Sequence, residues 1–477
     1  MIVPVSPGYA ASAAFAAIVH GVFVMAGLLL YVVTTRAGRQ RRHPSAALAW
    51  VVTIALLPYL AVPLFLLLGT RKLVKPASAA ALSPPGAGDA APRWAGTLLA
   101  GLGIAPTTYN AAVRFHADGH AAFSALMALL AAAEQRILLA TFILADDAAG
   151  NAVVDMLVQR AQAGVLVKVV LEPLTRVRCS GAQLDRLRAA GAEVRWANRG
   201  RPDRIETRLN LRYHRKMVVV DGAILWSGGR NLADEYFTND GNAPPWIDLT
   251  YDVHGPLAVD AGALFERDWR AAGGAALPAL AGERASDPAS DRSGDRAGSK
   301  AAAQLVPAGP DHADETYYGV LLAGAFQARD RILAVTPYFV PDDALLVAWR
   351  MACRRGVKVT LLVPARSNHR LADWARGRAL RDLAAAGAEI ILYPRMIHAK
   401  AVVIDATVAL CGSANLDSRS LFLNFEMMVA FYGAHEIAWL TDWIATRCTS
   451  GTPYIAHDPT LPVDLAEGLV RVVGFQL

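Results

Sequence analysis

Two long stretches near the start of the chain contain no charged residue. The first runs from Tyr9 to Val33 and the second from Ala46 to Gly69, so each is long enough to cross a membrane as a helix. Buried core helices rarely stay uncharged over such lengths, and no basic residue precedes the first stretch as it would in a secretory signal. The pattern therefore predicts a transmembrane hairpin of two helices within residues 1–75.

The basic residues around these stretches predict an orientation. Four arginines lie between the stretches and three basic residues follow the second: Arg36, Arg39, Arg41 and Arg42, then Arg71, Lys72 and Lys75. Because cytoplasmic loops carry the excess of Lys and Arg, this small margin places the connecting loop in the cytoplasm. A two-span hairpin returns the chain to its starting side, so the remainder of the chain is expected outside the cytoplasm.

Beyond residue 75, short apolar runs typical of buried strands alternate with amphipathic segments typical of helices. Residues 76–93 and 273–303 are rich in Ala, Pro, Ser, Gly or charged residues and predict linkers. The segments between and after them, 94–272 and 304–477, resemble each other: AGVLVKVVLEP at 163–173 recurs as RGVKVTLLVP at 355–364. We therefore predict two tandem α/β domains with largely parallel or mixed sheets.

The composition agrees with this division into an apolar N-terminal region and two domains, but it does not indicate the substrate. The mean hydropathy of +0.30 is high for a soluble enzyme and reflects the apolar N-terminal region. A net charge of +6 suits nucleic acid, anionic lipid or a phosphate ester equally well. The four cysteines show neither a CxxC pair nor a spacing typical of metal ligands, so we expect no metal and no disulfide framework.

Each half ends in the same polar pattern, His-x-Lys-x4-Asp-x6-Gly-(Gly/Ser)-x-Asn. Its members are His214, Lys216, Asp221 and Asn231 in the first half, and His398, Lys400, Asp405, Ser413 and Asn415 in the second. Residues two apart on a strand point to the same face, and the apolar residues 217–220 and 401–404 continue each strand into the core. The sequence thus predicts a His and a Lys that point together from a rigid platform in each half.

These are the HxKx4D motifs of the phospholipase D superfamily, and the resemblance extends over nearly the whole chain. NLRYHRKMVVVDGAILWSGGRNLADEYF, PPWIDLTYDVHGP and HAKAVVIDATVALCGSANLDSRSLFLNFE resemble segments of bacterial cardiolipin synthases. In that family the two halves form a pseudo-twofold pair whose motifs meet in one active site without a metal or other cofactor. The resemblance implies two tandem phospholipase D-like domains behind the membrane hairpin.

Transfer at a phosphodiester needs a nucleophile, an acid for the leaving alkoxide and cations that neutralise the phosphate. Two histidines near their ordinary pKa can divide the first two tasks at neutral pH. By resemblance we assign His214 as the nucleophile and His398 as the acid and later base, although the residues alone allow the reverse. Lys216 and Lys400 would hold the non-bridging oxygens of the phosphate, together with the side chains of Asn231, Ser413 and Asn415.

The resemblance also implies a carboxylate that orients each histidine, Asp248 in the first half and Glu426 in the second. Asp221 and Asp405 belong to the catalytic signature, but we expect them to stabilise the local fold rather than to transfer protons. The chain departs from the family pattern where Gly229 stands in the position of Ser413. A second departure lies in the strand before the first motif, where Thr141 or Asp146 would have to replace a usual glutamate.

The resemblance implies a phosphatidyltransferase of the bacterial inner membrane that joins two phosphatidylglycerol molecules to cardiolipin through a phosphohistidine. Hydrolysis of phospholipids is the alternative, and the acceptor lipid and the oligomeric state stay open. A nuclease is disfavoured because a membrane hairpin offers no advantage for nucleic acid and no aromatic-rich basic stripe is evident, and a non-enzymatic scaffold because both motifs are complete. Seven arginines between 195 and 215 would attract anionic headgroups or form a solvated loop.

Overall fold

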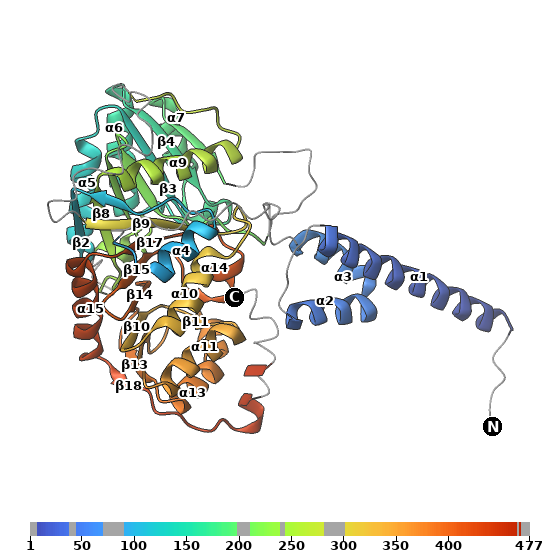
Figure 1. The fold of residues 1–477 in the computed structure, drawn as a ribbon. Coiled ribbons are helices and arrows are strands. Elements are labelled where there is room, and N and C mark those ends of the chain that lie inside the picture. The colour runs from blue at the N-terminus through green and yellow to red at the C-terminus, as the bar shows by residue number, and fades with distance from the viewer. Residues whose placement is uncertain are drawn as a thin grey trace.

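The computed structural model describes residues 7–37, 44–69, 90–197, 210–238, 244–280, 301–464 and 467–468. Within these ranges the chain forms a group of N-terminal helices and two large mixed β-sheets that are covered by helices (Figure 1). The predicted α/β class is confirmed. Most of the two predicted linkers, at 76–89 and 281–300, lies outside the described residues.

The sheet of the first half has seven strands among the described residues, and its central strands carry the first motif. Strands β3, β4 and β5 are parallel to one another, whereas β6, β7, β8 and β2 continue the sheet in antiparallel pairs. The spatial order is β2 (Ala112–His116), β8 (Thr250–His254), β7 (Ile224–Gly228), β6 (Met217–Val220), β3 (Arg136–Thr141), β4 (Leu166–Leu171) and β5 (Glu193–Trp196).

The sheet of the second half repeats this arrangement and adds a strand at each edge. Its parallel part is β10, β12 and β13, and the second motif enters through β14. The order is β1 (Thr108–Asn110), β9 (Ala301–Ala308), β17 (Glu426–Phe431), β15 (Val408–Gly412), β14 (Ala401–Ile404), β10 (Arg331–Val335), β12 (Lys358–Pro364), β13 (Glu389–Tyr393) and β18 (Thr452–Pro453). The short strands β11 (Phe339–Val340) and β16 (Leu416–Asp417) form a separate parallel pair.

Helices cover both sheets, and three apolar cores follow from this layering. The first half contributes α5 (Gly119–Ala131), α6 (Ala148–Gln162), the 3-10 turn Pro173–Arg178, α7 (Gly181–Ala189), α8 (Asp234–Phe237) and α9 (Pro256–Ala271). The second contributes α10 (Thr316–Gln327), α11 (Asp343–Arg354), α12 (Arg370–Ala375), α13 (Gly377–Ala385), α14 (Ser418–Phe422) and α15 (Ala434–Cys448). One core lies on the outer face of each sheet, and the third contains residues of both sheets. The two halves therefore share a continuous interior.

The first helical segment of the predicted first domain packs with the second half instead. Helix α4 (Arg93–Gly101) joins the outer core of the second sheet, and β1 pairs with β9 in antiparallel register. The boundary expected at residue 94 is thus displaced, because residues 93–110 cover the second sheet before the chain enters the first at β2. In the same way β9 begins at Ala301, inside the linker expected at 273–303.

The predicted transmembrane hairpin is only partly found. Helix α1 (Pro7–Ala37) contains one stretch, Ala14–Thr35, that is long and apolar enough to cross a membrane. The second expected span is instead divided into α2 (Pro44–Leu56) and α3 (Pro58–Leu68). Pro58 has no amide hydrogen to donate, and Leu57 before it leaves the helical region with φ −135° and ψ 57°. Residues 46–69 are therefore two short helices.

Candidate active site

The two motif histidines lie where the halves exchange backbone hydrogen bonds. The amide of His214 donates to the carbonyl of Phe425 in the second half at 2.9 Å. In the pseudo-symmetric position the amide of His398 donates to the carbonyl of Ile247 in the first half at 2.6 Å. Each histidine is therefore held beside a segment of the other half that directly precedes a buried carboxylate. This carboxylate is Glu426 for His214 and Asp248 for His398.

Each of the two histidines contacts a carboxylate from the other half. His214 Nδ1 lies 2.9 Å from the carboxylate of Glu426, and His398 Nδ1 lies 2.7 Å from Oδ2 of Asp248. Both carboxylates are fully buried. The expected residues are thus in place, but the expected pairing within each half is wrong. The crossed backbone contacts bring each carboxylate to the histidine of the opposite half.

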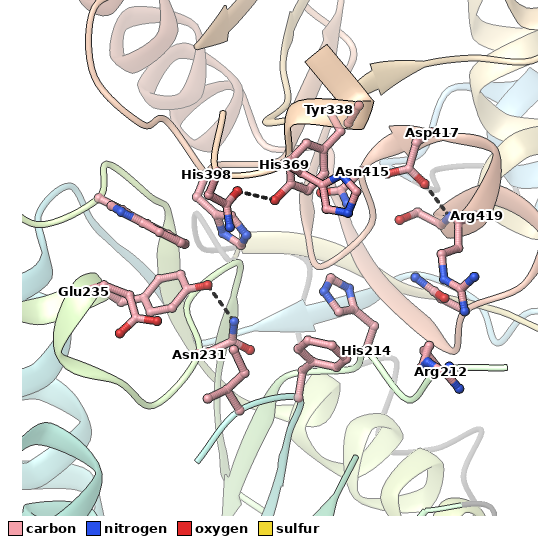
Figure 2. A pocket seen from close by; sticks show the side chains of 18 of the residues that line it. Arg212, His214, Asn231, Glu235, Tyr338, His369, His398, Asn415, Asp417 and Arg419 are labelled. Carbon is pink, nitrogen blue, oxygen red and sulfur yellow. Dashed lines mark hydrogen bonds between the residues drawn. The ribbon is translucent and has the colours of Figure 1, made fainter. Parts of the chain in front are cut away.

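The two imidazole rings line one cavity of about 340 Å³ between the halves. Figure 2 shows His214 entering from the first half and His398 from the second. Within the described ranges no three His, Cys, Asp or Glu side chains are grouped so that they could hold a metal ion. The site therefore presents two histidines, each with Nδ1 beside a buried carboxylate, and Nε2 of His398 also lies 3.1 Å from Nζ of Lys400.

Both motif lysines are buried next to their histidines. Lys216 Nζ donates to the carbonyl oxygen of His214 at 2.9 Å, and Lys400 Nζ lies 2.7 Å from Nδ1 of His398. Burial lowers the pKa of Lys216 to about 7 and that of Lys400 to about 8. Burial alone would raise the pKa of Asp248, but Lys400 and His398 beside it lower it below its ordinary value. The pair Asp248 and Lys400 is therefore ionised at neutral pH.

Burial favours the neutral form of both histidines. Burial lowers the pKa of His214 to about 4, although Glu426 acts in the opposite direction. Burial and the charge of Lys400 lower the pKa of His398 to about 3. This differs from the expectation of near-ordinary values. A bound phosphodiester would bring a negative charge beside the rings and raise the pKa of the histidine that donates the proton.

The lysines predict how activity depends on pH. Because the pKa values of Lys216 and Lys400 are lowered to about 7 and 8, their positive charges are present below those values and are lost as the pH rises through them. We expect kcat/KM for an anionic phospholipid to fall between about pH 7 and 9. Initial rates in mixed micelles, with recovery checked after return to neutral pH, would measure this. A profile that is flat up to the ordinary lysine value of 10.5 would contradict it.

The motif asparagines Asn231 and Asn415 line the cavity, whereas Ser413 lies behind its wall. The amide nitrogen of Asn231 donates to the hydroxyl of Tyr236 at 2.7 Å (Figure 2), and the side chain of Asn415 forms a hydrogen bond with Asp417. Ser413 Oγ donates to Glu426 at 2.5 Å and lies outside the cavity wall. In this structure the hydroxyl of Ser413 therefore contacts the carboxylate beside His214.

Gly229 has a steric reason for replacing the serine. A Cβ atom at this position would lie 2.2 Å from Oδ1 of Asp248. The glycine thus leaves the space that Asp248 needs to reach His398. At the other departure from the family pattern, Thr141 donates to the carbonyl of Ile143 and Asp146 accepts from Asn151, and neither side chain lines the cavity.

Asp221 and Asp405 have the structural role that we expected. Each occupies a turn with positive φ, 51° and 52°, and accepts hydrogen bonds from three consecutive backbone amides that lead into a central strand. These amides belong to residues 134–136 and 329–331. The aspartates therefore fix the strands that support the histidines, from the side of the turn rather than from the cavity.

Arg215, between the motif residues His214 and Lys216 in sequence, is buried on another side of this segment and joins the two halves. It is fully buried, and its guanidinium donates to Asp268 of the first half at 2.6 Å and to Asp311 of the second at 2.9 Å. Its Nε also donates to the carbonyl oxygen of Glu426. The segment that carries His214 is thereby hydrogen-bonded to the backbone of Glu426, whose carboxylate lies beside His214.

Removal of Arg215 should destabilise the docked halves. Replacing it with alanine leaves two buried carboxylates without their cation, which costs about 3–5 kcal/mol of unfolding free energy. Arg270 supplies a matched control, because it forms an exposed pair with Glu266 on the same helix as Asp268, worth about 0.3–0.5 kcal/mol. Urea unfolding of the detergent-solubilised variants, followed by tryptophan fluorescence, would compare them. Equal losses in both variants would contradict the role given to Arg215.

Three members of the arginine run belong to the described residues, and one of them lines the cavity. Arg212 lines the cavity, Arg215 is in the buried network, Arg195 lies 3.8 Å from Glu193, and positions 199–208 lie outside the described residues. Arg419 of the second half lines the cavity on the same side as Arg212 (Figure 2). Its guanidinium donates to the carbonyl of Asn210, and burial, followed by the charge of Arg212, lowers its pKa to about 10.

Several residues that line the cavity could not be predicted from the two motifs. Aromatic side chains form much of the wall: Phe142, Tyr236, Trp246 and Tyr338. Phe142 packs edge-on against His214, and Tyr236 packs edge-on against His398. They lie on segments flanking the motifs, so no spacing rule could have assigned them. Helix α15 packs into the core through Leu440 and Ile444, which are fully buried.

Comparison with known proteins places this fold and site in a defined group. A family model described as "Cardiolipin synthase, PLD-like domain" matches residues 126–269 and 322–447. A phosphatidylserine synthase structure from Haemophilus influenzae superposes with a TM-score of 0.60, 14% identity, and coverage of 79% of this chain and 98% of that chain. Polyphosphate kinase from Porphyromonas gingivalis superposes with a TM-score of 0.51 and 12% identity, over 77% and 54% of the two chains. These two likenesses concern the fold.

Curated relatives are more similar in sequence. Cardiolipin synthase A of Pseudomonas aeruginosa is 34% identical over 325 residues, which is 68% of this chain and 64% of that protein. Cardiolipin synthase A of Pseudomonas syringae is 32% identical over 69% of this chain and 66% of its own length. The chain thus matches slightly less than two thirds of the length of these relatives.

Two halves that each contribute a His-x-Lys motif to one shared cavity define a protein of the phospholipase D superfamily. Within it, the chain belongs to the family of the cardiolipin synthase, PLD-like domain.

Proposed function

We propose that this protein is a membrane-bound phosphatidyltransferase that joins two phosphatidylglycerol molecules to cardiolipin and releases glycerol. The observation that carries the proposal is the pair of histidines, each held at Nδ1 by a buried carboxylate, in one cavity. Such a pair suits two successive transfers at one phosphorus, because one ring attacks while the other handles the proton. Membership of the cardiolipin synthase family favours a phospholipid as the substrate.

In the proposed mechanism the Nε2 atom of His214 attacks phosphorus and forms a phosphorus–nitrogen bond, while the bond to the glycerol oxygen breaks. His398 gives its proton to the departing glycerol oxygen and then, as a neutral base, removes the proton from a hydroxyl of the second phosphatidylglycerol. That oxygen attacks phosphorus, and the bond to His214 breaks. Lys216 and Lys400 neutralise the non-bridging oxygens in both steps.

The wall of the cavity favours an anionic lipid as acceptor. Arg212 and Arg419 lie together on one side of it, away from Glu235 (Figure 2). A phosphatidylglycerol acceptor carries a phosphate of its own besides the reacting hydroxyl, and two guanidinium groups are suited to bind such a phosphate. We propose that this pair holds the acceptor headgroup, and that the apolar N-terminal helices attach the enzyme to the bacterial inner membrane that contains both substrates.

Hydrolysis of phospholipids is the competing function, in which water replaces the acceptor. The product spectrum separates the two. In mixed micelles of phosphatidylglycerol and detergent, transfer gives cardiolipin and glycerol in equal amounts, whereas hydrolysis gives phosphatidic acid and glycerol. The His214→Ala variant serves as the inactive control. Phosphatidic acid as the main product at saturating phosphatidylglycerol would overturn the proposed transfer.

A further inference from the structure

The second apolar region, which forms α2 and α3, reverses its direction at the break between these two helices and packs beside α1. The ring of Trp50 in α2 packs against that of Phe65 in α3 at 5.2 Å between centroids, although the two residues are fifteen positions apart. Phe65 also contacts Tyr31 near the end of α1, again at 5.2 Å, whereas Tyr59 at the start of α3 packs against His20 at 5.8 Å. Helix α3 thus runs in the same direction as α1, and α2 runs against both.

Close packing fixes this arrangement of three helices. A Cβ atom at Gly27 of α1 would lie 2.9 Å from Ile54 of α2 and 2.6 Å from Val62 of α3, so only a residue without a side chain lets both helices approach. Ile54 and Ala61 are fully buried between the helices. The turn at Leu57 and Pro58 is therefore supported by protein on one side, as irregular backbone within a membrane requires.

The lengths of the helices indicate how far each reaches. At 1.5 Å per residue, the 31 residues of α1 extend over about 46 Å, more than the hydrocarbon core of about 30 Å. The 13 residues of α2 and the 11 of α3 extend over about 20 and 17 Å, too little to cross. Figure 1 shows both short helices alongside α1, with the end of α3 close to the end of α1 that precedes α2.

The outward surface of this group is apolar. Large hydrophobic side chains are exposed on all three helices, among them Phe15, Met25, Leu29, Leu48, Leu56 and Leu60. Leu56 next to the turn is 69% exposed. A surface of this kind and extent needs cover, and lipid chains match its uninterrupted apolar character on every exposed side.

We propose that α1 crosses the membrane once, that α2 and α3 form a re-entrant hairpin within it, and that both β-sheets lie in the cytoplasm. In this arrangement seven basic residues fall on one side of the membrane: Arg36, Arg39, Arg41, Arg42, Arg71, Lys72 and Lys75. None of residues 1–6 is basic. The positive-inside rule then favours a cytoplasmic active site clearly, whereas a two-span hairpin divides the same charges almost equally.

Cysteine accessibility tests the number of crossings. In a parent with Cys179, Cys353 and Cys448 replaced by alanine, the fully buried Cys411 is retained and sets the background. Ser6→Cys reports the N-terminal end, and Ile455→Cys, at a residue 69% exposed, reports the second sheet. A membrane-impermeant maleimide should label Ser6→Cys only in right-side-out vesicles and Ile455→Cys only in inverted vesicles. Labelling of both on the same side, or the exchanged pattern, would overturn the proposal.

A cross-link tests the hairpin directly. Trp50→Cys combined with Phe65→Cys should react with one short bis-maleimide to give a single intrachain link, found by peptide mass spectrometry of the membrane protein. In a straight helix the two positions would be about 22 Å apart, beyond the reach of the reagent. The two single variants are the controls. Separate modification of both thiols without a link would overturn the re-entrant hairpin. The inference rests on the membrane attachment proposed above, but neither test uses enzymatic activity, so failure of the proposed reaction would be seen separately.

Discussion

Replacing His214 with alanine should abolish the covalent phosphatidyl adduct and lower kcat by roughly 10⁵-fold or more, the size of effect typical of removing a nucleophile. Among the described residues, His398 is the other histidine that lines the cavity with Nδ1 held by a buried carboxylate, and its proposed task is proton transfer. His398→Ala should behave differently with a phosphatidyl ester of p-nitrophenol. This leaving group needs little acid assistance, so the adduct should still form. Its breakdown should then stall, because the base that activates the acceptor is missing.

Acid-quenched samples with labelled substrate, digested and mapped, would follow the adduct. We expect label on His214 in the His398→Ala variant and none in the His214→Ala variant. His254→Ala is a suitable control, because this histidine is 47% exposed and pairs with Asp252 away from the cavity. Label on His398 in the absence of His214 would reverse the two roles. If the wild-type protein forms no adduct at all, direct transfer between the lipids is the better mechanism.

Glu426→Gln should slow the formation of the adduct and Asp248→Asn should slow its breakdown, each by about 10²–10⁴-fold. Glu426 holds His214, so its amide variant should slow adduct formation even from the activated ester, because the ring loses its preferred tautomer. Asp248 holds His398, so its amide variant should form the adduct from the activated ester and then release it slowly. Each substitution preserves size, and each serves as the control for the other.

Rapid-quench measurement of p-nitrophenol release separates the two steps. A burst followed by slow turnover is expected for Asp248→Asn, and a loss of the burst for Glu426→Gln. If the carboxylates acted within their own halves, the two results would be exchanged. The measurement therefore tests the crossed pairing in solution, independently of the overall rate.

The motifs were sufficient to predict the strand and the turn that support the site. The strand begins at Met217, directly after Lys216, so His214 and Lys216 lie in the segment that leads into it, and the aspartate five residues after the lysine occupies the turn that ends this strand. The same local rule applies to His398, Lys400 and Asp405. Such features depend on a few neighbouring residues, which is why they can be read from the sequence.

The partners of the histidines depend on how the halves dock, and local patterns contain no such information. Glu426 is 212 positions from His214, and Asp248 is 150 positions from His398. The contact between Ser413 and Glu426 has another origin, since it arises from β15 and β17 lying side by side within the second sheet, which motif spacing does not reveal. The displaced domain boundary at residues 93–110 is likewise a property of the docked sheets.

Hydropathy could not distinguish a helix that crosses the membrane from one that turns back within it. Both keep an uncharged apolar stretch of the same length, and prolines alone do not mark the turn. Pro58 begins α3 after a break, whereas Pro63 lies inside α3 without ending it. The difference depends on contacts with α1, such as the close approach of Ile54 and Val62 to Gly27. These contacts exist only in the folded arrangement.

The crossed carboxylates also bear on the order of events during synthesis. A ribosome releases the first half before the second, and domains generally fold in that order. At that stage His214 and Lys216 are present, but Glu426 has not yet emerged, so the ring has no partner to fix its tautomer. In the proposed mechanism the first half alone therefore lacks both the carboxylate that orients His214 and the acid supplied by His398, and full activity requires the docked second half.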